Sequence, residues 1–83
     1  MPTIIGKIGR TIASENKNRI FSKVEIIDYQ KHRSFIEFRG DLKLMVDSIE
    51  QGNNIKAEVY IHGKLSASGH PYNNIIATSI EKL

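Results

Sequence analysis

The stretch GDLKLMVDSIEQG, residues 40–52, has the clearest helical repeat in this chain. Its large apolar residues recur at i, i+3, i+4 and i+7, which places them on one face of an α-helix. They are Leu42, Met45, Val46 and Ile49. Asp41 is a typical N-cap residue, and Gly52 is a residue type that commonly ends a helix. The segment therefore predicts a helix over residues 41–51.

The segments on either side of this helix have the patterns of β-strands. Three strands are expected before it, at residues 3–13, 19–29 and 34–39. Two are expected after it, at residues 55–62 and 73–80. The first strand after the helix alternates apolar and polar residues throughout, which is typical of an antiparallel strand with one face in water. The chain therefore predicts the order β-β-β-α-β-β.

That order in about 80 residues is the order of the OB-fold, a five-stranded Greek-key barrel. Gly6 and Gly9 interrupt the first strand, and glycine inside a strand often marks a bulge or a sharp bend, which a small barrel needs in order to close. A chain of 83 residues has the size of one domain. We therefore predict an all-β OB-fold with one helix, in which residues 1–83 form a single domain.

The inward-facing side chains of these segments make up the predicted core. They are Ile4, Ile8, Val24, Ile26, Ile36, Phe38, Leu42, Met45, Val46, Ile49, Ile55, Ala57, Val59, Ile61, Ile75, Ala77 and Ile80. Ile27 and Ile76 are expected on the outside, where they would need cover. A chain this short buries only about 60% of the surface that its unfolded state exposes, so burial of further surface against a partner subunit would increase its stability. Together these features favour a homodimer or a higher homo-oligomer.

The composition excludes several kinds of chemistry. The chain has no cysteine, which rules out disulfides, Cys-ligated zinc and thiol catalysis. Its histidines, His32, His62 and His70, lack the spacing of a metal site, and neither a nucleophile elbow nor a glycine-rich phosphate loop is present. We expect no enzymatic activity, metal or cofactor. Without a signal peptide or a long apolar run, we expect a cytoplasmic protein with no membrane partner.

Basic residues gather in the first half of the chain. Residues 1–39 hold eight basic residues against four acidic ones, whereas residues 41–51 hold three acidic residues against one basic. In an OB-fold the first three strands form the sheet that usually carries the ligand, and an excess of positive charge there favours a polyanion. The candidate phosphate-binding residues are Lys7, Arg10, Arg19, Lys23, Arg33, Arg39, Lys56 and Lys64.

Single-strand binding also needs flat side chains on which bases can stack. Four aromatic residues fall at outward-facing or loop positions, and they are Phe21, Phe35, Tyr60 and Tyr72. Each of them could instead fill the barrel rim or a subunit interface. Glu25, Glu37 and Glu58 fall on the presumed binding face, where acids repel phosphate. A protein-interaction module, or an oligomeric accessory subunit without nucleic-acid binding, is therefore the alternative.

Several short motifs give the chain a family resemblance. They are IIGKI at residues 4–8, FIEFRGD at 35–41, IEQGN at 49–53 and SGHPYNNI at 68–75. With them the chain resembles a family of small bacterial OB-fold proteins similar to single-stranded-DNA-binding proteins, with PriB-like proteins and phage single-strand binders as relatives. The resemblance implies sequence-independent binding of single-stranded DNA or RNA in replication, repair or recombination. The family often has tryptophan where Arg39 and Thr78 stand, so phenylalanine and tyrosine would form the stacking surface here.

Overall fold

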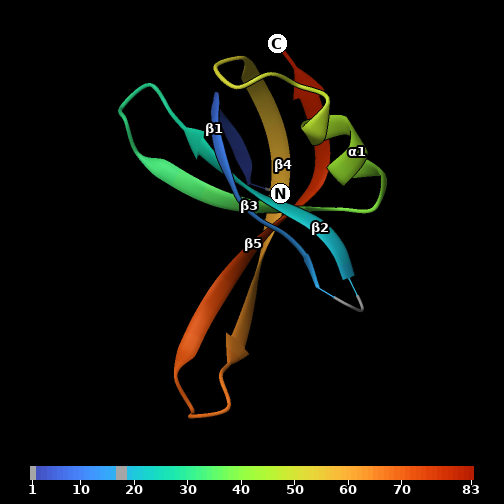
Figure 1. The fold of residues 1–83 in the computed structure, drawn as a ribbon. Helices are drawn as coiled ribbons and strands as arrows, with labels where there is room; N and C mark the ends of the chain where they lie inside the picture. Colours follow the sequence, from blue (N-terminus) through green and yellow to red (C-terminus); the bar gives the residue numbers. More distant parts are fainter. Residues whose placement is uncertain (1, 17–18) are drawn as a thin grey trace.

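The computed structural model describes residues 2–16 and 19–83, and within them every side chain except those of residues 13–16 and 19. These residues form five strands and one helix, in the order that the sequence predicts (Figure 1). The elements are β1 (Thr3–Asn16), β2 (Arg19–Ile27), β3 (Arg33–Arg39), α1 (Asp41–Asp47), β4 (Asn54–Leu65) and β5 (Pro71–Lys82). No helix in this described part of the chain is long and apolar enough to span a bilayer.

The strands close into a barrel in the order β1-β2-β3-β5-β4. β3 and β5 run parallel, and every other neighbouring pair runs antiparallel. The long strand β1 closes the ring because it pairs with β4 through residues 3–7 and with β2 through residues 7–16. β4 and β5 continue past the barrel as a two-stranded hairpin (Figure 1). The predicted all-β OB-fold with one helix is confirmed.

The course of β1 depends on two glycines. A Cβ atom at Gly6 would lie 2.4 Å from the carbonyl oxygen of Ile27, so β1 and β2 approach too closely there for any side chain. The register between the two strands then shifts between Ile8 and Thr11, a segment that contains Gly9. The register shift is the irregularity that the glycines in the sequence predict, whereas the close approach at Gly6 is a finding of the structure.

The helix α1 ends at Asp47 rather than at residue 51, so it is shorter than predicted. Its buried residue is Val46, and its position covers one end of the barrel beside β5, β2 and β3 (Figure 1). The predicted N-cap Asp41 is instead the first helical residue. Gly40 takes the cap position with a φ of 58°, a backbone conformation that glycine adopts without strain.

A side-chain network ties the end of α1 to the barrel. Ser22 on β2 donates a hydrogen bond from Oγ to Asp47 Oδ1 at 2.8 Å, and Lys43 Nζ donates to Asp47 Oδ2 at 2.6 Å. Burial alone would raise the pKa of the Asp47 carboxyl. The hydrogen bonds from Lys43 and Ser22, together with the charge of Lys43, outweigh that effect and hold this pKa below its ordinary value.

The core draws apolar side chains from all five strands and from α1, and it contains most of the predicted residues. Two predicted core residues, Met45 and Ile61, are exposed, so these predictions were wrong. Met45 is exposed because the short helix packs on the barrel through Val46. Ile61 is exposed because it lies two residues beyond Val59, the last buried residue of β4, on the part of that strand that no longer pairs with β1.

Candidate nucleic-acid interface

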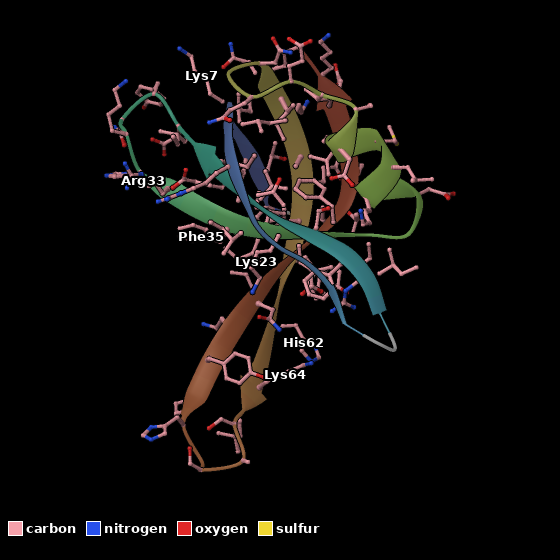
Figure 2. The ribbon with its side chains drawn as sticks, in the orientation of Figure 1. Lys7, Lys23, Arg33, Phe35, His62 and Lys64 are labelled. Atoms are coloured by element: carbon pink, nitrogen blue, oxygen red, sulfur yellow. The ribbon has the colours of Figure 1, made fainter. Side chains whose placement is uncertain are left out.

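Most of the predicted site residues lie on one side of the sheet that β2, β3 and the β4–β5 hairpin form. Along each strand the core side chains alternate with side chains that point away from the core, because successive residues face opposite sides of a strand. We call the side away from the core the outer face. Figure 2 shows Arg33, Phe35 and Lys23 on the barrel part of this face, and His62 and Lys64 further along on the hairpin.

Strand register aligns the outward side chains in rows across the sheet. In the central row, Lys23 on β2 pairs with Glu37 on β3, Glu37 pairs with Ile76 on β5, and Ile76 pairs with Tyr60 on β4. The row therefore sets a cation at one end and an aromatic ring at the other. Since both ends are at least partly open to solvent, an extended ligand could contact both.

The neighbouring rows continue this pattern toward the turn between β2 and β3. Phe35 pairs with Glu25 and is 44% exposed, so about half of its ring is open to a ligand. The row beyond it consists of Lys7, Ile27 and Arg33, which the pairing of β1, β2 and β3 brings together. A stacking ring thus lies between two rows that carry cations.

Four other predicted residues have different surroundings. Phe21 and Arg39 form the row on the other side of Lys23, and both are half-buried. The side chain of Arg19 lies outside the described residues. Lys56 does not join the outer face, because its neighbour on β1 is Ile5, which lies around the barrel.

The hairpin brings donor groups around a small hollow. This hollow has a volume of about 180 Å³ and is lined by Arg39, Tyr60, His62, Lys64 and Ile76. Ile76 is only 4% exposed and forms the floor, so the prediction that Ile76 lies exposed on the surface was wrong. Guanidinium, ammonium and phenol groups around one hollow suit an anionic oxygen. His62 was not among the predicted site residues, although the alternation of β4 places it on the same side as Tyr60 and Lys64.

The end of the hairpin differs between its two sides. Tyr72 pairs with Lys64, and both lie on the side that continues the outer face. The opposite side carries Ile61 and Leu65, which are 60% and 72% exposed. One side of the hairpin is therefore aromatic and basic, while the other is apolar.

A wider cleft lies where the outer face meets the wall that carries Ile5, between the start of β1 and the turn that joins β2 to β3. It has a volume of about 670 Å³, and Lys7, Tyr29 and Lys31 are among its lining residues. Asp28 holds the turn, since its Oδ1 accepts hydrogen bonds from two backbone N–H groups of the same turn, each at 2.9 Å. Tyr29 and Lys31 were not predicted as site residues. They extend the pattern of rings and cations past Arg33.

Of the three acids expected on the binding face, Glu25 and Glu37 are buried beside arginines, whereas Glu58 is exposed on β4. Glu25 and Glu37 are each 5% exposed. Arg39 Nε donates a hydrogen bond to Glu37 Oε2, and Glu25 lies between Arg10 and Arg33. Within the described residues, no group of three or more His, Asp or Glu side chains is placed to hold a metal ion.

The barrel is similar to solved structures of a single-stranded-DNA-binding protein. A crystal structure of the mitochondrial single-stranded DNA binding protein Rim1 from S. cerevisiae, labelled with selenomethionine, has a TM-score of 0.68 and 14% sequence identity. The match covers 99% of this chain and 92% of that chain. A second Rim1 structure has a TM-score of 0.60 and 16% identity, with 99% and 90% covered. The two proteins share a fold.

Comparison at the level of sequence adds nothing to this likeness, because no family model and no curated protein matches the chain. At 14–16% identity the structural likeness concerns the fold alone. The PriB-like or phage relatives, the bacterial origin and the homo-oligomer suggested by the sequence stay predictions.

Proposed function

We propose that this protein binds single-stranded nucleic acid along its outer face, with single-stranded DNA as the expected ligand and without sequence preference. The observation that carries the proposal is the succession of rings and cations on one side of the sheet. Arg33, Phe35 and Lys23 follow one another on the barrel, and Tyr60 and Lys64 continue the series on the hairpin. Cations at this spacing meet backbone phosphates, while the rings stack with bases.

Stacking explains why no sequence preference is expected. Every base has an aromatic face, so a ring binds all four with similar strength. Two acids that could accept hydrogen bonds from base edges, Glu25 and Glu37, are buried beneath the outer face. An OB-fold of this kind covers about 4–16 nucleotides. The likeness in fold to the mitochondrial single-stranded DNA binding protein Rim1 supports the same ligand class.

Two lysines of the outer face have no carboxylate neighbour among the described ion pairs. Among the described residues, neither Lys23 nor Lys64 takes part in an ion pair, whereas Arg10, Arg33 and Arg39 each face a buried carboxylate. A lysine without a partner contributes its full charge to counterion release when it meets a phosphate. We place the activity in replication, repair or recombination in the cytoplasm, carried out by a homodimer or higher homo-oligomer.

The proposal is tested by fluorescence polarisation with a labelled oligo-dT strand of about 30 nucleotides, which exceeds the site of one OB-fold. The duplex of the same length and an oligo-rU strand are titrated beside it at about 50 mM salt. Tight binding to the DNA strand and weak binding to duplex are expected. Stronger binding to oligo-rU would assign the protein to RNA, and saturation by duplex alone would contradict the proposal.

The alternative is a protein-interaction module, and one observation favours it. Ile61 and Leu65 form an exposed apolar side of the hairpin, opposite the basic side. Replacing both with serine should lower the oligomeric state in light scattering if this side contacts a second copy. If the variant keeps its oligomeric state and the wild-type protein does not bind single strands, these results would assign the hairpin to contact with a different protein.

A further inference from the structure

Glu25 is a carboxylate buried at the centre of the outer face. Its side chain is 7% exposed, Arg33 Nε lies 3.5 Å from Oε2, and Arg10 Nε lies 3.9 Å from Oε1. Oε2 makes no hydrogen bond with any described residue. Burying a carboxylate costs free energy unless it is well paired, so its position requires a structural cause.

Gly9 supplies the space that this carboxylate occupies. A Cβ atom at Gly9 would lie 2.4 Å from Glu25 Oε1 and 3.1 Å from its Cδ. Only glycine at this position therefore lets the Glu25 side chain lie against β1. The atoms that meet the added Cβ belong to the far end of a flexible side chain. A methyl group at residue 9 would move the carboxylate and leave the strands in place.

We propose that Glu25, seated against Gly9, is a positioning residue that holds Arg10 and Arg33 ready for a backbone phosphate. The inference rests on the proposed function. Both arginine side chains stay largely exposed while the carboxylate beneath them is covered. One carboxylate between two guanidinium groups leaves the cluster with a net positive charge. Phe35 is the cross-strand partner of Glu25, so a base stacked on Phe35 would carry its phosphate to this cluster.

An exposed Glu25 carboxylate would repel the phosphates of a bound strand, whereas the buried one positions two arginines for them. Arg10 and Arg33 lie within ion-pair distance of the carboxylate, without a hydrogen bond to its Oε2. Arginine has a large side-chain entropy, and a guanidinium that is already attracted to one position loses less of it when a phosphate binds. If the Glu25 carboxylate were displaced from its position against Gly9, it would project toward solvent, where the phosphates of a bound strand would lie. The same charge would then repel the ligand.

The substitution Gly9→Ala separates position from charge, because it displaces the carboxylate and keeps the formal charge of the protein. Affinity for a labelled oligo-dT strand should fall about three- to tenfold, the size expected of a like charge brought near a phosphate. Gly63→Ala is the matched control in β4, since a Cβ there meets only Asn73 Oδ1 at 3.4 Å. Its affinity should stay within about twofold of wild type.

The double variant Gly9→Ala/Glu25→Gln distinguishes positioning from a loss of stability. Glutamine is displaced in the same way but carries no charge, so affinity should return to about the level of Glu25→Gln alone. The melting temperature should remain that of Gly9→Ala, because both side chains are displaced by the same methyl group. Glu25→Gln alone should bind within about threefold of wild type, since lost orientation offsets the gained positive charge.

Three results would overturn the role of Glu25. The first is wild-type affinity in Gly9→Ala, and the second is a double variant as weak as Gly9→Ala. The third is binding by Glu25→Gln that is more than about threefold tighter than wild type, which would mean that the buried carboxylate already opposes the strand. If the wild-type protein does not bind oligo-dT, the proposed function fails and this role with it. Wild-type binding that is insensitive to Gly9→Ala overturns the role of Glu25 alone.

Discussion

Replacing Phe35 with alanine removes the ring best placed for base stacking. Phe35 is 44% exposed and lies on the outer face, away from the core. Loss of one stacked base costs about 1–3 kcal/mol by alanine substitution, which is about a 5- to 150-fold loss of affinity. Full burial of a phenylalanine contributes about 1.5–3 kcal/mol to stability, so a ring that is half in water contributes about 1 kcal/mol. The variant should fold and bind weakly.

The assay is a polarisation titration with oligo-dT at several salt concentrations. If the outer face meets four to six phosphates, the log–log slope of affinity against salt is about −3 to −4. Stacking releases no counterions, so Phe35→Ala should keep this slope while its affinity falls. Leu44→Ala is a control, because Leu44 is an exposed apolar residue on α1, outside the outer face. Its affinity and slope should match those of the wild type.

Two results would refute this reasoning. Unchanged affinity in Phe35→Ala would mean that no base stacks on the ring. A flattened salt slope would mean that the ring acts by ordering neighbouring cations such as Arg33, and the division between stacking and charge would then be wrong.

The other predictions concern charge, pH and assembly. Lys64→Ala should flatten the log–log slope of affinity against salt by about 0.7. Arg39→Ala should flatten it less, because Arg39 is already paired with Glu37. Equal slopes in the two variants would contradict this prediction. Asp47→Asn should melt at a lower temperature than wild type near neutral pH. Because the folded pKa of Asp47 lies below its ordinary value of 3.8, that difference should shrink as the pH falls below 3.8; a constant difference would count against it. Light scattering should report at least twice the monomer mass of 9.4 kDa, and a monomer at tens of micromolar would rule out the oligomer.

The elements of the fold could be predicted because each has a local signature. The apolar spacing from Leu42 to Ile49 marks the helix, and the alternation from Ile55 onward marks β4. Gly6 and Gly9 mark the irregular course of β1, where the structure has a close approach and a register shift. These signals come from residues a few positions apart in the chain, so the sequence alone is enough to read them.

Burial at the edges of the barrel could not be predicted, because it depends on where the barrel ends. Ile61 follows the alternation of β4 but lies beyond the part paired with β1, so it is exposed. Ile76 has the parity of an exposed residue but forms the floor of the hollow between longer side chains. The pairing register between distant strands decides both cases.

Only part of the candidate site could be predicted, because the rest also depends on how distant strands pair. Period-2 alternation places Lys23, Phe35 and Tyr60 away from the core. The alternation does not reveal that the Glu25 side chain packs against Gly9, because that contact depends on how β1 passes β2. It also leaves Lys56 in the site, although the closure of the barrel carries this residue to another wall.

The central claim is that single strands bind along the outer face, and an NMR titration tests it most directly. Uniformly ¹⁵N-labelled protein is titrated with oligo-dT, and the amide shifts are mapped onto the strands. The account predicts changes that gather on β2, β3 and the hairpin, around Lys23, Phe35, His62 and Lys64. Changes confined to α1 or to the wall around Ile5 and Lys56, or no changes at saturating oligo-dT, would contradict it.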